Sequence, residues 1–164
     1  MTANAHVPRT RDALGLCAFL LLAFGVLVLG GMAAAPAIGV WYPALRKPPW
    51  TPPGWVFGPV WALLYPTMAL AGWLAWRQGR SRRGPLLYLV QLALNAAWPW
   101  LFFAERRPEL ALVDALALVV AVLATAVAFW PVHRTAALLL LPYLGWVAFA
   151  AALTGAIVRL NPAR

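Results

Sequence analysis

The stretch WYPALRKPPWTPPGWVFGPVWALLY, from Trp41 to Tyr65, organises the whole chain. Its first half is crowded with prolines, which lack the amide proton and push the preceding residue out of the α-helical region, so no long helix is expected there. Indoles stand between these prolines, and the only lysine, Lys47, lies beside Arg46 in the middle. A stiff, aromatic and cationic loop between two apolar helices predicts a lid over a binding site.

The composition is that of a membrane protein. Apolar residues make up 64% of the chain and charged residues 10%, with a mean hydropathy of +0.78, whereas a soluble domain has roughly 45–50% apolar and 25% charged residues. The net charge of +9 comes from arginine clusters between apolar runs, where basic side chains meet lipid head groups. No motif for reading bases accompanies that charge, so we expect a lipid bilayer and no nucleic acid as partner.

The apolar runs predict an all-α membrane protein, a five-transmembrane-helix bundle with a long Pro/Trp-rich first loop, in one domain over residues 1–164. The expected spans cover about residues 13–38, 56–77, 85–104, 108–130 and 135–160, and the lid loop covers about 39–55. Each span has the roughly 20 residues that a helix needs to cross a bilayer. We therefore expect a multi-pass protein of a bacterial-type membrane.

The orientation in the membrane is left open by the charges. With five spans, one side would carry Arg9, Arg11, Arg77, Arg80, Arg82, Arg83 and Arg134. The other side would carry Arg46, Lys47, Arg106, Arg107, Arg159 and Arg164. Seven basic residues against six is too small a difference for the positive-inside rule to choose between the two orientations.

Polar side chains inside a span are costly and usually have a purpose. Gln91, Asn95, Trp98 and Phe102 recur at helical spacing, so they form one stripe of the third span. The sequence leaves two interpretations of the amides open: polar handles in a ligand pocket, or hydrogen bonds between helices. Asp114 stands near the start of the fourth span, where a carboxylate complements the helix N-terminus, and we interpret it as structural.

Signatures of catalysis are missing from the sequence. The two histidines are far apart, no His/Cys/carboxylate cluster has metal-ligand spacing, and glycine-rich phosphate loops are absent. We therefore expect no metal and no required cofactor, and enzymatic activity stays uncertain. What remains is a pocket lined by aromatic rings with a few polar handles.

Four motifs are specific: WYPALRKPPWTPP at 41–53, WVFGPVW at 55–61 followed by Tyr65, QLALNAAW at 91–98, and PYLGWVAFA at 142–150. Together they resemble the TspO/MBR family of tryptophan-rich sensory proteins and translocator proteins. The resemblance implies a membrane receptor, often a homodimer, that binds porphyrins such as protoporphyrin IX, haem-like tetrapyrroles and other flat lipophilic ligands. Two departures stand out: Thr154 replaces the usual asparagine, and Val158 precedes Arg159 where the sterol motif needs an aromatic residue.

The resemblance also implies a pocket within the bundle, capped by the first loop. Matched position by position, its residues are Trp41, Tyr42, Pro52, Trp61, Tyr65, Asn95, Trp98, Phe102, Trp146, Ala150 and Leu153. From their charge we add Arg46 and Lys47 as partners for the porphyrin propionates. Head-group contact is the alternative role for these two side chains.

Three activities fit these expectations. The first is binding of the porphyrin ligand for tetrapyrrole sensing, regulation or transport. The second is light-dependent degradation of porphyrin, for which Trp41 and Trp146 are the candidate catalytic residues, because they match tryptophans implicated in the family. The third is a carrier that moves lipophilic molecules across the membrane.

Overall fold

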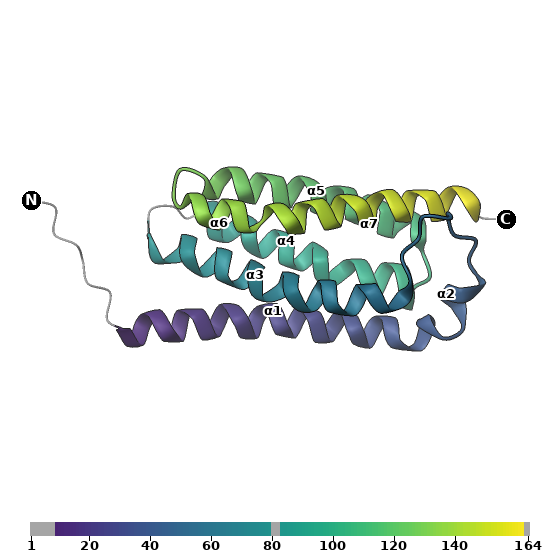
Figure 1. Cartoon of the computed structure of the whole chain (residues 1–164), viewed down its shortest axis with the longest axis horizontal. Helices are drawn as coiled ribbons and strands as arrows, with labels where there is room; N and C mark the ends of the chain where they lie inside the picture. Colours follow the sequence, from purple (N-terminus) through teal and green to yellow (C-terminus); the bar gives the residue numbers. More distant parts are fainter. Residues whose placement is uncertain (1–8, 80–82, 163–164) are drawn as a thin grey trace, which may run out of the picture.

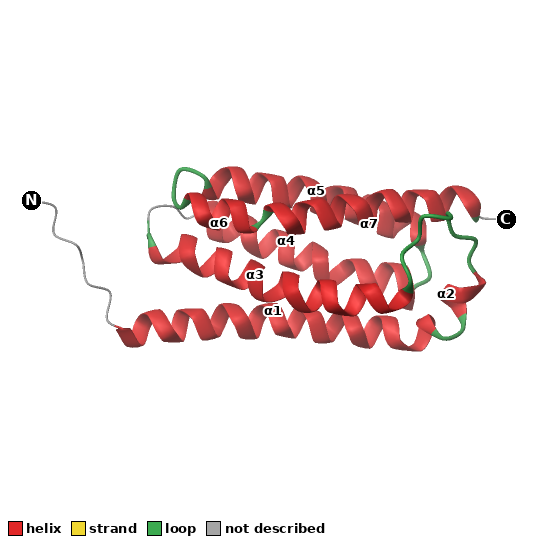
Figure 2. Cartoon of the chain, in the orientation of Figure 1, coloured by secondary structure: helices red, strands yellow, loops and turns green. Residues whose placement is uncertain are grey.

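The chain forms helices over nearly all the residues that its structure, a computed structural model, describes, namely 9–79 and 83–162 (Figures 1 and 2). The elements are α1 (Arg9–Ile38), α2 (Trp41–Ala44), the 3₁₀ turn η1 (Gly54–Val56), α3 (Phe57–Arg77), α4 (Arg83–Pro99), the π-helical turn η2 (Trp100–Ala104), α5 (Pro108–Phe129), α6 (Arg134–Leu139) and α7 (Leu141–Leu160). The predicted arginines Arg80, Arg82 and Arg164, and the side chain of Arg9, lie outside the described part.

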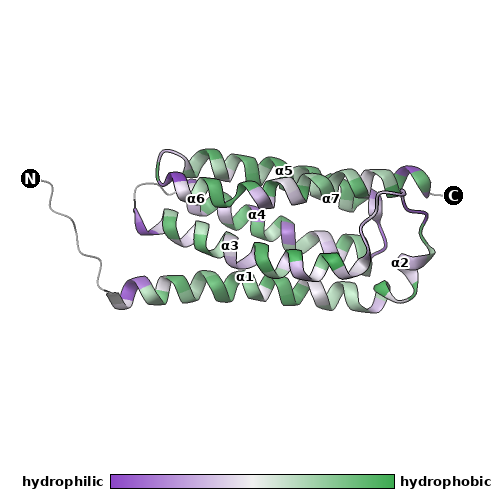
Figure 3. Ribbon diagram, in the orientation of Figure 1, coloured by the Kyte–Doolittle hydropathy of each residue, from purple (hydrophilic) through white to green (hydrophobic). Residues whose placement is uncertain are grey.

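Within the described residues, five helical stretches are long and apolar enough to cross a membrane: Thr10–Ile38, Gly54–Arg77, Arg83–Ala104, Pro108–Phe129 and Arg134–Leu160. In Figure 3 the hydrophilic colour concentrates at the two ends of the bundle, and the hydrophobic colour predominates on the helices between them apart from a hydrophilic patch in the middle of α4. The predicted all-α, five-span fold is confirmed. The protein is a multi-pass membrane protein.

The long first loop is not confirmed in its predicted form. Residues 39–56, which we call the cover segment, join α1 to α3 and contain two short helical pieces, α2 and η1. Pro43 lies inside α2, where a missing amide proton costs little because the first turn of a helix has no acceptor for it. The prolines therefore limit helix length in this segment without abolishing helix.

The spanning helices form a closed ring around the core. Helix α1 packs against α3 and α4, and α5 packs against α4 and α7. The short helix α6 joins α3 to the rest of the ring at one end, whereas α3 and α7 make few close backbone contacts. Helix α1 begins at the end near α6, and α7 finishes at the opposite end, beside the cover segment (Figure 1).

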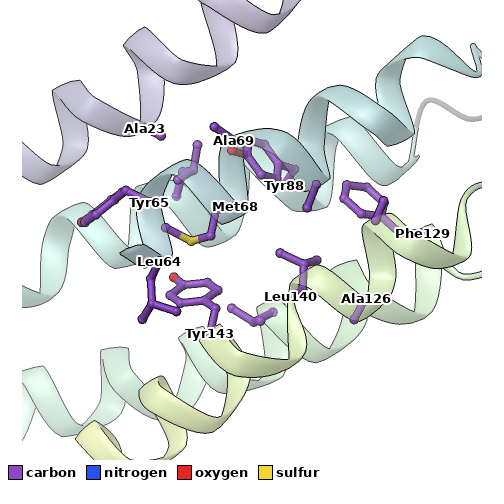
Figure 4. Close-up of a cluster of buried hydrophobic side chains, with 14 of the residues drawn as sticks. Ala23, Leu64, Tyr65, Met68, Ala69, Tyr88, Ala126, Phe129, Leu140 and Tyr143 are labelled. Carbon is purple, nitrogen blue, oxygen red and sulfur yellow. The ribbon is translucent and has the colours of Figure 1, made fainter. Parts of the chain in front are cut away.

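Small residues let the helices approach while aromatic rings fill the centre. Figure 4 shows this core, in which Tyr65, Met68, Tyr88, Phe129 and Tyr143 come from four helices. The close approach has a clear example at Gly72, where a Cβ atom would lie 2.7 Å from the Phe19 ring. A side chain at that position would force the rings of α1 and α4 to move.

The end of the bundle opposite the cover segment is held by polar contacts at the expected membrane interface. Arg77 Nη2 lies 2.7 Å from Asp12 Oδ2, and Trp73 Nε1 donates a hydrogen bond of 3.0 Å to the Asp12 carbonyl oxygen. The Arg77 guanidinium also lies 4.5 Å from the centre of the Trp73 ring. These contacts hold α1 against α3 at this end of the bundle.

Candidate ligand-binding site

One group of aromatic rings gathers around Phe102, beneath α2 of the cover segment. The Phe102 ring is stacked on Trp98 at 5.0 Å between centroids and meets Trp41 edge-on at 5.5 Å and Tyr42 at 6.3 Å. Leu153 of α7 is buried in the same cluster. Five predicted pocket residues thus come together from four elements, and we call them the Phe102 group.

The π-helical turn η2 sets the direction of these rings. Pro99 ends α4, and because it has no amide proton it cannot bond the carbonyl oxygen of Asn95 one turn earlier. The helix widens at once into the π turn, in which Glu105 N donates to Trp100 O. Such turns rotate side chains relative to an α-helix, and here Phe102 and Phe103 both contact Tyr42.

A second group of rings joins α3 to α7, and we call it the Trp61 group. Trp61 lies 5.4 Å from Tyr65, 6.3 Å from Tyr143 and 6.5 Å from Trp146, measured between ring centroids. Trp146 continues the group to Phe57 at 5.7 Å and Phe149 at 5.4 Å. Side-chain rings, rather than close backbone approach, therefore connect α3 with α7.

Asn95 is the polar centre of the site. It is 4% exposed, its Oδ1 accepts a hydrogen bond of 2.5 Å from the Tyr65 hydroxyl, and its Nδ2 donates one of 2.8 Å to the Tyr143 oxygen. One amide thus bonds α3 and α7 to α4. In the structure Asn95 therefore forms hydrogen bonds between helices. A ligand that bonded to this amide would have to share or replace these two hydrogen bonds.

Gln91 and Asp114 differ from Asn95. Gln91 is fully buried on α4, and neither of its amide atoms has a hydrogen-bond partner among the described residues. Asp114 is 8% exposed, with Oδ2 similarly unpartnered within the described chain. Asp114 therefore faces the interior of the bundle rather than the membrane interface.

Hydrogen bonds fasten the cover segment over the aromatic groups. Lys47 Nζ donates to the carbonyl oxygens of Tyr42 at 2.7 Å, Leu45 at 2.8 Å and Pro43 at 3.3 Å, so its three ammonium protons are all engaged. Burial raises the pKa of the Tyr42 phenol, which stays neutral and lies 4.7 Å beneath the same ammonium. Lys47 thus stabilises the C-terminal end of α2.

Asn161, just after α7, ties the segment to the far end of the chain. Its Oδ1 accepts a hydrogen bond of 3.0 Å from Arg46 N, and its Nδ2 donates a hydrogen bond of 2.9 Å to Arg46 O. This reciprocal pair holds the Arg46 backbone, while the residue itself stays exposed. The Arg46 guanidinium and the Lys47 ammonium, paired in the sequence prediction, therefore stand in different environments.

Substituting Asn161 with alanine is expected to loosen the cover segment. Two hydrogen bonds to Arg46 disappear, each contributing about 1 kcal/mol, so the Arg46 amide should exchange with solvent deuterium roughly tenfold faster or more. Hydrogen–deuterium exchange of the purified protein in nanodiscs measures this. Asn161→Asp keeps the acceptor for Arg46 N and serves as the control, with a smaller increase expected.

The remaining predicted residues border the site without adding ring contacts. Pro52 is half-buried in the cover segment. Ala150 is half-buried on α7, and its carbonyl oxygen accepts a hydrogen bond of 2.8 Å from the hydroxyl of Thr154. Thr154, which departs from the family pattern, thus bonds its own helix.

Sequence reasoning left four aromatic residues out of the site: Phe57, Phe103, Tyr143 and Phe149. Each lies in ring contact with a predicted residue. Tyr143 and Phe149 lie within the fourth quoted motif, three residues to either side of Trp146, and this helical spacing was the available signal.

Comparison with known proteins assigns the chain to a family. The profile described as TspO/MBR family matches residues 17–160. The chain belongs to the TspO/MBR family. Among its relatives, Tryptophan-rich protein TspO of Archaeoglobus fulgidus is 41% identical over 152 residues, covering 92% of this chain and 99% of the relative.

Other members of the TspO/MBR family come from distant organisms. Translocator protein of Homo sapiens is 47% identical over 126 residues, which covers 74% of this chain and 75% of the relative. Protein CrtK of Rhodobacter capsulatus is 35% identical over 137 residues, covering 81% and 86%. The resemblance read from the four motifs is thus confirmed at the level of the family.

Proposed function

We propose that this protein binds porphyrins and related flat lipophilic molecules between its two aromatic groups. The observation that carries the proposal is a pair of aromatic groups in one bundle. The Trp61 group surrounds the buried Asn95 amide through Tyr65 and Tyr143, and the Phe102 group lies beneath α2 of the cover segment. A conjugated macrocycle presents two broad faces, and indole and phenol rings can stack on or meet such faces edge-on, contributing about 0.5–1.5 kcal/mol per contact beyond burial of area.

The way α3 meets α7 favours accommodation of a guest. Their connection consists of the rings Trp61, Tyr143 and Trp146, which lie at 64° and 88° to one another in the pairs made with Trp61. Aromatic side chains can turn about two torsions, whereas closely packed backbones can separate only by moving whole helices. A flat ligand can therefore take the place of ring-to-ring contacts with its own ring contacts.

Titration with protoporphyrin IX tests the proposal. The protein in nanodiscs should show saturable quenching of tryptophan emission, because several indoles would lie against the bound macrocycle. An excess of non-fluorescent flat competitor should reverse the quenching. Quenching that rises linearly with porphyrin, without saturation, would mean partition into lipid and would contradict a binding site.

The two cations of the cover segment are expected to contribute differently to a ligand with propionates. Lys47 can bind an anion only by releasing a backbone carbonyl, whereas the exposed Arg46 guanidinium can form a bidentate pair. Arg46→Gln should raise the Kd of the dicarboxylate about twofold, since an exposed pair contributes about 0.5 kcal/mol. The porphyrin dimethyl ester is the matched control, and its Kd should not change; an equal change for both ligands would exclude a charge contact.

Light-dependent degradation is the second candidate, favoured by the contact between Trp61 and Trp146. An excited porphyrin can accept one electron from a neighbouring indole, which gives an indole radical cation and a porphyrin radical anion. Dissolved oxygen can then add across a meso carbon bond, so that this bond breaks and each of its carbons keeps one oxygen atom as a carbonyl, while the electron returns to the indole. Illumination of the complex should bleach the porphyrin absorption under this alternative, and Trp146→Phe should slow the bleaching. Bleaching at the rate of porphyrin in empty nanodiscs would leave binding as the function.

A carrier of lipophilic molecules is the third candidate, because the human relative bears the name Translocator protein. Flux of porphyrin out of preloaded liposomes would distinguish a carrier from a receptor. The homodimer that the family resemblance implies also stays a prediction, which the mass of the protein in detergent, measured by light scattering, can test.

A further inference from the structure

A groove of about 440 Å³ runs between α1 and α3 on the outer surface of the bundle. Its lining residues are Leu20, Leu21, Ala23, Phe24, Leu27, Ala62, Tyr65 and Pro66. Leu21 and Phe24 are 72% and 59% exposed, whereas Ala23 and Tyr65 are buried. The groove therefore opens toward the lipid, at the middle of two spanning helices, and Ala23 and Tyr65 form its floor.

Tyr65 belongs to the groove and to the proposed site at the same time. Its ring lies 5.4 Å from Trp61 within the Trp61 group, and its hydroxyl donates to Asn95. Figure 4 shows the Tyr65 side chain on α3 in the part of the core that faces Ala23 of α1. Tyr65 thus borders both the lipid-facing groove and the aromatic interior.

Two features make this position easier to open than the cover segment. Among the described residues, the Tyr65 hydroxyl makes one hydrogen bond, whereas Lys47 and Asn161 together make five hydrogen bonds to backbone atoms of residues 42–46. Pro66, beside it in the groove, cannot donate to the carbonyl oxygen of Ala62, so the helical ladder of α3 lacks one bond there. Transmembrane helices bend most readily at such positions.

We propose that this groove is the lipid-side entrance to the site, with Tyr65 as its gate and Asn95 as the latch of that gate. The inference rests on the proposed binding function. The lining is apolar apart from the Tyr65 hydroxyl, and a charge is costly at this depth of the bilayer. The entrance therefore admits flat, uncharged molecules dissolved in the lipid, such as a porphyrin diester, and a dicarboxylate porphyrin enters from water past the cover segment instead.

Ala62→Phe tests the entrance by filling the groove from α3. Stopped-flow tryptophan quenching would follow protoporphyrin dimethyl ester delivered from preloaded liposomes to the protein in liposomes. Association and dissociation should both slow about tenfold, corresponding to about 1.4 kcal/mol at the barrier, with the Kd changed less than twofold. Rates for protoporphyrin IX added from water should stay unchanged.

Ala117→Phe, at an exposed alanine of α5, is the matched control and should leave all rates unchanged. Tyr65→Phe keeps the ring but loses the bond to Asn95, so it should accelerate both rates for the ester. If Ala62→Phe does not fold, Leu21→Trp provides a second way to fill the groove, from α1. Its control is Leu116→Trp, at an exposed leucine of α5.

The outcomes separate the entrance from the binding function. Ester rates in Ala62→Phe equal to those in Ala117→Phe, with a normal Kd, would overturn the entrance alone. A raised Kd with unchanged association would also overturn it, since the groove would then be part of the binding site. Absence of saturable quenching by either porphyrin in the unaltered protein would overturn the binding function and the entrance together.

Discussion

Replacing Trp146 with alanine is expected to weaken porphyrin binding by roughly thirtyfold, or about 2 kcal/mol. Trp146 contacts Phe57, Trp61 and Phe149, so it stands where rings of α3 and α7 meet. Its removal takes away a broad stacking surface and one of the two edge-on neighbours of Trp61. The Kd from tryptophan quenching, or from the porphyrin absorption shift, measures the effect.

A conservative variant and a distant one complete this experiment. Trp146→Phe retains a ring and should lose less than about 1 kcal/mol of binding free energy. Trp130→Ala removes an indole that is 50% exposed at the opposite end of the bundle, near Arg134, and should not alter the Kd. Equal losses in Trp146→Ala and Trp130→Ala would show that quenching reports porphyrin in the lipid rather than in the site.

The number and approximate ends of the spans could be predicted because apolar runs and charged turns follow from the low dielectric of the bilayer. The stripe of the third span could be predicted from helical spacing alone, since residues 91, 95, 98 and 102 share a face of any regular helix. In the structure Trp98 and Phe102 stay stacked on each other even though the helix changes to a π turn at Trp100.

Long-range partners could not be predicted from the sequence. Nothing near Asn161 in the sequence points to Arg46, which is 115 positions away. The sequence suggested that the Lys47 ammonium was free to bind a ligand. Its partners are backbone carbonyl oxygens, which every residue has, and the turn of α2 brings three of them to one ammonium. The groove beside Tyr65 depends on the spacing between α1 and α3, which packing sets.

Asn95 allowed two interpretations for a related reason. Its polarity within an apolar span indicated that it must have partners, but an amide can bond a ligand or another helix equally well. The structure supplies two tyrosine hydroxyls from different helices. Whether these bonds stabilise the fold can be measured separately from ligand binding.

Asn95→Leu is expected to destabilise the folded protein by about 2 kcal/mol, because it leaves the hydroxyls of Tyr65 and Tyr143 buried without their present partner, at about 1 kcal/mol or more each. Tyr143 is fully buried and Tyr65 is 5% exposed, so water cannot readily replace the amide. The free energy of unfolding in mixed micelles of increasing SDS content measures the change.

The triple variant Tyr65→Phe, Asn95→Leu, Tyr143→Phe isolates the cause. Removing every member of this network leaves none of its own polar groups buried and unpaired, and such replacements are often nearly neutral. The triple variant should therefore recover to within about 1 kcal/mol of the unaltered protein, although it has three substitutions and Asn95→Leu has one. Were it instead less stable than Asn95→Leu, the cost would lie in side-chain shape at position 95, and the hydrogen bonds that join α3, α4 and α7 would contribute little to the fold.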